Sequence, residues 1–197
     1  MGYRVIPSPI SSRNIYGLGI ESIPSESECY PAKLVHGHVQ WLINLGVETI
    51  FYPNVIYEHR EVKEANNTFN CPIVGTYSEN IVNNIDDLKE KNISYWNPFL
   101  SLDGEKQATK RLVEIMQQYS DASVSEIKEA AKKAFVEDAQ FKQDIRTEGE
   151  KAIAYLEKTG KKGIVLAGRP YHVVPEVHHE IPDLITEYDV AVLTEDS

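Results

Sequence analysis

Two hydrophobic periods alternate along the chain, and together they predict alternating helices and strands. Apolar side chains at residues 31–45 recur with helical spacing, and Gly46 follows where a helix would end. The predicted apolar face of this helix consists of Leu34, Val35, His38, Trp41, Leu42 and Leu45. Short apolar runs, several of them β-branched or aromatic, predict strands at residues 4–7, 17–23, 48–52, 93–96, 162–167 and 190–193. Pro53 and Pro98 are expected to end the strands that precede them.

Residues that cap helices mark the remaining predicted helices. Ser78 precedes a set of helically spaced apolar residues, and Asp103 precedes another such run. Ser123 and Glu126 have the spacing of a capping box, in which each side chain satisfies a backbone N–H of the other residue. These signals predict helices at residues 78–88, 103–118, 123–158 and 180–188, with Gly160 ending the third.

This alternation predicts an α/β fold with mainly parallel sheets, arranged as flavodoxin- or Rossmann-like lobes. The helical stretch in the middle is far longer than an ordinary connection, so it is expected to separate two lobes. We predict a first α/β lobe at residues 1–102, a helical segment at residues 103–159 and the start of a second lobe at residues 160–197. Since the chain begins close to one predicted strand and ends just after another, we expect the first lobe to be truncated at its N-terminus and the second at its C-terminus.

Composition and charge restrict the class of function. The 197 residues carry a formal net charge of −10, within the composition of ordinary soluble globular proteins. An acidic chain lacks the basic footprint of nucleic-acid binding, and no apolar run approaches the roughly 20 residues of a membrane span. The N-terminus lacks the layout of a signal peptide, so a cytoplasmic location is expected. The sequence contains no phosphate-binding glycine loop, and this chain itself is therefore not expected to bind ATP.

Cys29 is the first candidate for a chemically active residue. Pro31 suits the first turn of a helix, which places Cys29 just before or at the helix start. There the helix dipole and free backbone N–H groups favour a thiolate, the form that binds metals and attacks electrophiles. Lys33 adds positive charge, whereas the neighbouring glutamates oppose it, so the sign of the net effect stays open. Ser25 belongs to the same candidate site, although Ser25 and Glu28 also fit a capping box.

Cys71, the second cysteine of two, is the other candidate. It precedes Pro72 after a polar loop, near a predicted strand end, where α/β folds gather ligands. A buried core thiol is the alternative interpretation. The two cysteines lie about 40 residues apart, a spacing unlike that of zinc-finger or ferredoxin motifs. Any metal that they share would depend on tertiary proximity and on further ligands from histidines, from additional chain or from a partner.

Histidines and one arginine are weaker candidates. His36 and His38 flank a glycine on the first long helix and point in different directions, so two structural histidines are expected rather than a metal site. Arg169 lies in a turn after a predicted strand and could bind a phosphate or carboxylate, although a tight turn with an exposed arginine is the alternative. The candidate substrate or cleft residues are therefore Ser25, Lys33, Arg169 and His172.

Several stretches of the sequence resemble one family. They lie at residues 23–38, 70–74, 166–172 and 179–182, and the most specific is Ser-Glu-Ser-Glu-Cys-Tyr-Pro-Ala-Lys at residues 25–33. They resemble the uncharacterised domain that accompanies the CoA-enzyme activase ATPase, which is in turn similar to the iron–sulfur subunits of 2-hydroxyacyl-CoA dehydratases and benzoyl-CoA reductases. The resemblance implies a [4Fe–4S] cluster held by cysteines between α/β lobes, low-potential electrons from an ATP-driven activase domain, and acyl-CoA as a partner. Cys29 and Cys71 match the family's cysteine positions and are the implied metal ligands.

Three functions are consistent with these observations. The first is a fragment of a 2-hydroxyacyl-CoA dehydratase-related iron–sulfur protein that accepts electrons from the activase, with Arg169 lining the cleft and with the fragment inactive on its own. The second is a non-catalytic interaction module that docks the activase or a partner subunit through the helices at residues 103–159. The third, which rests on fold analogy alone, is a flavodoxin-like binder of a flavin or another small molecule.

Overall fold

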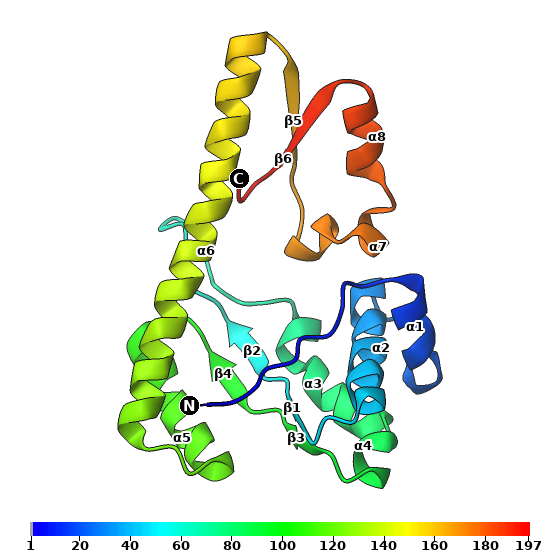
Figure 1. Cartoon of the computed structure of the whole chain (residues 1–197), viewed down its shortest axis with the longest axis vertical. Helices are drawn as coiled ribbons and strands as arrows, with labels where there is room; N and C mark the ends of the chain where they lie inside the picture. The colour runs from blue at the N-terminus through cyan, green and yellow to red at the C-terminus, as the bar shows by residue number, and fades with distance from the viewer. Residues whose placement is uncertain (1) are drawn as a thin grey trace. The chain divides into compact units, whose positions relative to one another are not determined.

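The computed structural model describes residues 2–197, apart from the side chain of Pro170, and the chain divides into two compact units. Unit 1 extends to Lys132, and unit 2 comprises Lys133–Ser197. The elements of unit 1 (Figure 1) are α1 (Arg13–Gly19), η1 (Ile20–Ser22), α2 (Tyr30–Leu45), β1 (Thr49–Phe51), β2 (Asn54–Tyr57), α3 (Pro72–Asn84), α4 (Asp87–Glu90), β3 (Ser94–Trp96), β4 (Phe99–Ser101), α5 (Glu105–Tyr119) and the beginning of α6 (Val124–Thr159). Unit 2 contains the rest of α6, then β5 (Lys162–Leu166), η2 (Pro170–Val173), α7 (Pro175–His178), α8 (Ile181–Glu187) and β6 (Val190–Thr194).

Parallel strand pairs confirm the predicted α/β fold. β1 pairs with β3, β2 with β4 and β5 with β6, all in parallel. The predicted division into residues 1–102, 103–159 and 160–197 stays a prediction. The two compact units are defined by contacts within the chain and do not test where an α/β lobe begins or ends.

The strand pairs of unit 1 form one ribbon that prolines interrupt. Between the pairs, the Tyr52 N–H donates to the Trp96 carbonyl and the Asn54 N–H to the Pro98 carbonyl, each at 2.9 Å. The ribbon therefore continues across Pro53, which has no N–H to donate. The predicted strand ends before Pro53 and Pro98 are confirmed, since β1 ends at Phe51 and β3 at Trp96, but each chain stays extended past its proline and pairs again as β2 or β4.

The core of unit 1 lies between three helices and the strand ribbon. α2, α3, α4 and β1 contribute its buried side chains, which are Ala32, Val39, Ile43, Ile50, Tyr77, Ile81, Ile85 and Leu88. Tyr52 and Tyr95 of the ribbon pack against this cluster. Burial raises the pKa of Tyr52 to about 12, so its phenol stays neutral within the packed layer.

Helix α2 matches its predicted bounds but not its predicted face. Gly46 follows the helix with φ 82°, the left-handed conformation typical of a residue after a helix C-terminus. Ala32 and Ile43 face the core, whereas Gly37 faces α1, so the helix is buried on two sides. Leu45 was predicted on the apolar face, but its side chain is exposed, and that prediction is wrong.

Two glycines allow α1 to approach α2 closely. A Cβ added at Gly37 would overlap the carbonyl group of Ile15, and one added at Gly19 would overlap the backbone of Gly37. Ile15 and Gly19, four residues apart, are the buried residues of α1. The strand predicted at residues 17–23 is therefore wrong: the stretch forms the end of α1 and then η1, because its small and apolar residues serve a helix contact.

One predicted strand and one predicted helix start are also wrong. Residues 4–7 form no strand within the described part of the N-terminal segment, and Val5 is 82% exposed, so no neighbouring strand is there to cover it. α3 begins at Pro72 and not at Ser78, because proline suits the first helical turn. Ser78 instead lies inside α3, where its hydroxyl donates to the Tyr52 carbonyl at 2.5 Å.

The predicted starts of α5 and α6 are close to the observed ones. Gly104, rather than Asp103, is the cap residue of α5. The capping box of α6 is confirmed: the Ser123 N–H donates to the Glu126 carboxylate at 2.9 Å, and the Glu126 N–H donates to the Ser123 hydroxyl at 3.3 Å. These exchanged bonds fix where the 36-residue helix begins.

Unit 2 contains one strand–helix–strand unit beside the second part of α6. β5 and β6 pair over their whole length, from Lys162 opposite Val190 to Leu166 opposite Thr194. The strands predicted at residues 162–167 and 190–193 and the helix predicted at residues 180–188 are confirmed to within a few residues.

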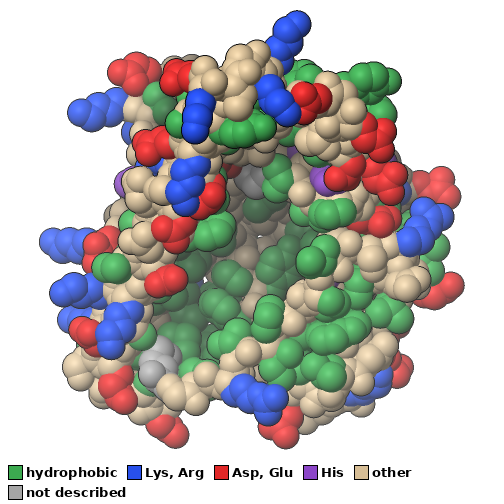
Figure 2. All heavy atoms as spheres, turned by 45° about the horizontal axis from the view of Figure 1, so that its top comes forward, with side chains coloured by type: hydrophobic (Ala, Val, Ile, Leu, Met, Phe, Trp, Pro, Cys, Tyr) green, Lys and Arg blue, Asp and Glu red, His purple; other side chains and the backbone are tan. Residues whose placement is uncertain are grey.

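The surface is charged with both signs. On the face drawn in Figure 2, Lys and Arg side chains are interspersed with Asp and Glu side chains. Among residues 2–197, no helix combines the length and the apolar character that crossing a membrane requires.

The glycine contact between α1 and α2 gives the first prediction. Gly37→Ala should lower the free energy of unfolding by about 1–3 kcal/mol, because the new methyl group overlaps the Ile15 backbone. Gly17→Ala is the matched control: no atom lies within 4 Å of the added Cβ, so the better helix propensity should stabilise α1 by up to about 1 kcal/mol. Urea unfolding followed by tryptophan fluorescence measures both, since Trp41 and Trp96 are the two tryptophans of the chain and both lie in unit 1. Equal stability of the two variants would contradict the described contact.

Candidate functional site

Cys29 lies at the start of α2, as predicted. It is the N-cap residue, with φ −65° and ψ 148°, and Pro31 occupies the first helical turn. The thiol-bearing residue is exposed. Helix starts present backbone N–H groups that lack an intrahelical acceptor, and the Cys29 side chain makes no capping hydrogen bond to them.

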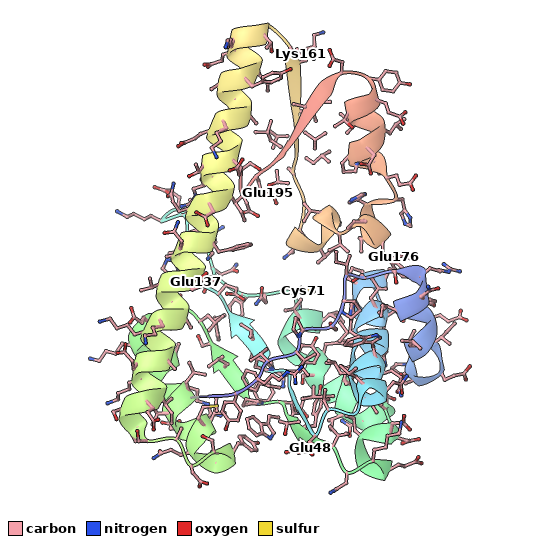
Figure 3. All side chains as sticks on the ribbon, viewed as in Figure 1. Glu48, Cys71, Glu137, Lys161, Glu176 and Glu195 are labelled. Carbon is pink, nitrogen blue, oxygen red and sulfur yellow. The ribbon has the colours of Figure 1, made fainter. Side chains whose placement is uncertain are left out.

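Cys71 repeats the same local arrangement at the start of α3. It is the N-cap residue, with φ −51° and ψ 138°, and Pro72 is the first helical residue. Figure 3 shows Cys71 at this end of α3. Cys71 is half-buried, whereas Cys29 is exposed. Two cysteines in one unit therefore each cap a helix that carries a proline in its first turn.

The loop before Cys71 holds that residue at the carboxyl end of β2. The Asn70 N–H donates to the Ile56 carbonyl at 2.9 Å, and the Asn70 side-chain amide donates to the Val55 carbonyl at 3.1 Å. Tyr57 and Phe69 form an antiparallel bridge across the same loop. Cys71 thus lies near a strand end, but that strand is β2, which was not among the predicted strands. Such carboxyl edges are where α/β folds gather ligands.

Glu28 connects the start of α2 to α3. Its carboxylate accepts a hydrogen bond from the Tyr77 hydroxyl at 2.5 Å and one from the Asn80 side-chain amide at 3.2 Å. The capping box proposed for Ser25 and Glu28 is therefore wrong, because Glu28 bonds to α3 instead of to its own helix start. The Ser25 hydroxyl bonds to the Ser27 hydroxyl at 2.7 Å.

Lys33 folds back over the segment that precedes Cys29. Its ammonium donates to the Glu26 carbonyl at 2.7 Å, which places a positive charge beside the start of α2. The structure thus brings Ser25, Lys33 and Cys29 to one helix start, as the sequence motif suggested. Their role in binding stays a prediction.

His36 continues the connection into the core, and sequence reasoning missed this. The residue is fully buried, and its Nε2 lies 2.9 Å from the Tyr77 hydroxyl. Since Tyr77 donates its one hydrogen to Glu28, which only accepts, His36 Nε2 donates to Tyr77. Nδ1 lies 2.8 Å from the Ser22 hydroxyl, whose one hydrogen also faces the Gly19 carbonyl at 2.9 Å. The sequence shows a histidine on α2, but it does not show that Ser22 and Tyr77, which are distant along the chain, are the hydrogen-bond partners of this histidine.

Burial governs the protonation of this chain of hydrogen bonds. Desolvation lowers the pKa of His36, although the charge of Glu28 partly opposes this. Desolvation also raises the pKa of the Tyr77 hydroxyl, together with the hydrogen bond and charge of Glu28 and the charge of Cys29.

His38 is a separate structural histidine, as predicted. Its Nε2 lies 2.9 Å from the Ser11 hydroxyl, and burial lowers its pKa. His36 and His38 thus bond to different partners and do not converge on one point.

Arg169 and His172 lie in the turn after β5 in unit 2. The Arg169 N–H donates to His172 Nδ1 at 2.8 Å, and the Gly168 N–H donates to both oxygens of the Glu195 carboxylate at 3.2 Å. A carboxylate of the chain itself thus accepts from the backbone N–H of the residue before Arg169. The substrate roles of Arg169 and His172 stay predictions.

The chain offers two thiols for a metal or cluster. Among residues 2–197, His, Cys, Asp and Glu side chains form no group of three or more that could hold a metal ion. Cys29 and Cys71, each at a helix start, therefore fit two positions of a thiolate ligand set but not a complete one.

The buried histidine gives a pH prediction. Because the folded state lowers the pKa of His36, neutral His36 contributes stability above the usual pKa of 6.5, and this contribution is lost as the pH falls through the lowered value. The free energy of unfolding of unit 1 should therefore fall on acidification, and less steeply in His36→Gln. Urea titrations followed by tryptophan fluorescence from about pH 7.5 to pH 5.5 measure the slope.

His38→Gln is the control that isolates the share of the second histidine, whose pKa is also lowered. If folded His36→Gln shows the same pH slope as the wild type, buried neutral His36 is not a source of the acid sensitivity.

Comparison with known proteins identifies the family. The family described as CoA enzyme activase uncharacterised domain matches residues 1–197. No curated protein and no solved structure matches the chain. The resemblance seen around Cys29, Cys71 and Arg169 thus extends over the full sequence, and the chain belongs to the CoA enzyme activase uncharacterised domain family.

Proposed function

We propose that this domain is part of a 2-hydroxyacyl-CoA dehydratase-related iron–sulfur protein that accepts electrons from an ATP-driven activase. Membership of a family linked to CoA enzyme activase supports the choice of electron donor. The observation that carries the proposal is the pair of cysteines, each at the N-cap of a helix and each followed by a proline in the first turn.

In this proposal Cys29 and Cys71 are two of the thiolate ligands of a [4Fe–4S] cluster. Such a cluster, when bound, supplies one-electron transfer at low potential. The residues of this chain would stabilise negative charge on both sulfurs through the N–H groups at the starts of α2 and α3, and Lys33 would add positive charge beside Cys29. Since Cys29 and Cys71 are the two cysteines of the sequence, the remaining ligands would come from additional chain or from a partner. Acyl-CoA is the substrate class that we propose with this activity.

A second function is favoured by a different observation. α6 carries large apolar side chains that face solvent, among them Val136 at 64% and Phe141 at 61% exposure. We propose as the alternative that α6 docks the activase or a partner subunit without taking part in catalysis, because exposed apolar side chains on one helix are typical of contact surfaces.

Cluster content tests the leading proposal. After anaerobic reconstitution of the full-length protein with iron and sulfide, Cys29→Ser and Cys71→Ser should each lose most of the iron–sulfur absorbance and EPR signal, because serine is a poor ligand for iron in these clusters. Ser27→Ala is the control, since Ser27 is an exposed neighbour of Cys29 with no proposed contact to the cluster. A full cluster in Cys29→Ser would remove that residue from the ligand set.

Binding to the activase tests the alternative. In a pull-down with the activase domain, Val136→Glu should weaken binding about ten-fold if α6 docks it, because the variant places a charge in the contact. Ala134→Glu adds the same charge to an exposed position about 200° around the helix and should bind normally. Unchanged binding of Val136→Glu would exclude Val136 from the docking surface.

A further inference from the structure

A series of hydrogen bonds joins the start of α2 to α3, and we name it the Glu28 clamp. Its members are Glu28, Tyr77, Asn80 and His36. The Tyr77 hydroxyl donates to Glu28 at 2.5 Å, Asn80 donates to the same carboxylate at 3.2 Å, and His36 lies 2.9 Å from the Tyr77 oxygen. The clamp therefore ties the segment before Cys29 to a helix that is remote in sequence.

Burial makes this connection directional and strong. His36 is 0% exposed and Tyr77 is 3% exposed, so neither group exchanges its partner for water at low cost. The single hydrogen of Tyr77 goes to Glu28, and its oxygen accepts from His36, so each role is filled. Glu28 adds a charge-assisted bond, which is roughly twice as strong as a neutral one.

The clamp joins a residue next to Cys29 to the helix that Cys71 caps. Glu28 directly precedes Cys29, and Tyr77 follows Cys71 by six residues of α3, which is about 9 Å along the helix axis. The Cα–Cβ bonds of a helix tilt toward its N-terminus, which in α3 is the end that carries Cys71.

We propose that Glu28 is a positioning residue that, through Tyr77 and His36, holds the Cys29 thiol at a fixed place relative to the Cys71 thiol. This inference rests on the proposed function, in which both thiols bind one cluster. The dipole of each helix acts only at that helix's own start and does not depend on the other cysteine, whereas binding of one cluster by two thiols requires a fixed separation between them. A hydrogen bond from the residue next to one cysteine to the helix of the other provides such a restraint.

The restraint can be measured without a cluster. In the cluster-free full-length protein, dibromobimane joins two nearby thiols, each thiolate displacing one bromide and forming a carbon–sulfur bond. Peptide mass mapping identifies the Cys29–Cys71 product. Tyr77→Phe keeps the ring and removes the hydroxyl, so the rate of this cross-link should fall about ten-fold, which is the loss expected for a hydrogen bond to a charged group. Glu28→Gln keeps an oxygen acceptor for Tyr77 and should cause a smaller fall, whereas Glu28→Ala should match Tyr77→Phe.

Tyr95→Phe is the matched control. Its hydroxyl lies 2.9 Å from the Ser78 hydroxyl and 3.3 Å from the Ser78 carbonyl, and within residues 2–197 these bonds lead to α3 and not to the start of α2. It should lower stability without changing the cross-link rate. Tryptophan fluorescence and circular dichroism confirm that each variant is folded, and Glu28→Gln keeps the test valid if Tyr77→Phe does not fold.

Two outcomes overturn the positioning role. One is a cross-link rate in folded Tyr77→Phe and Glu28→Ala that equals the wild-type rate. The other is a wild-type protein in which Cys29 and Cys71 never form the product. The cluster measurements test the ligand assignment independently of the clamp. If the clamp variants slow the cross-link while Cys29→Ser retains a full cluster, the positioning role of Glu28 is supported and Cys29 is not a cluster ligand.

Discussion

Helix α2 is buried on two sides, and this constraint determines most of what surrounds it in unit 1. Ala32 and Ile43 face the core formed with α3, α4 and β1, while Gly37 meets the backbone of α1. A helix in this position has little room for side chains of the ordinary amphipathic pattern. It needs a glycine where α1 crosses, and any polar residue along it needs a partner within the protein.

His36 is that polar residue, and satisfying it creates the connection to the candidate site. Both ring nitrogens are hydrogen-bonded, one to Ser22 of η1 and the other to Tyr77 of α3. Because Tyr77 must pass its own hydrogen to an acceptor, a carboxylate in the segment before Cys29 completes the series. The need to satisfy buried His36 is thereby linked, through Tyr77 and Glu28, to the segment that carries exposed Cys29.

The sequence predicted the helix starts and ends more reliably than the strands. Proline in a first turn and glycine after a last turn act locally, so the position of Cys29 and the end of α2 at Gly46 could be predicted. The strand at residues 17–23 was wrong because short apolar runs fit both a helix and a strand. The continuation of the ribbon past Pro53 was missed because a proline removes one donor but leaves the carbonyls of both chains free to pair. The Glu28 clamp could not be predicted, since its central bond joins residues 49 positions apart.

The two cysteines differ in one respect that matters for the proposed cluster site. The local arrangement is the same at both cysteines: each is the N-cap residue of a helix with a proline in its first turn. This arrangement is set by each helix separately. Cys71 follows a loop that backbone bonds tie to β2, so its position is set by the sheet. Cys29 follows an exposed segment whose connection to α3 is made by Glu28. Under the proposal, the separation between the thiols therefore depends on a side-chain bond beside each cysteine, from Asn70 to β2 and from Glu28 to α3.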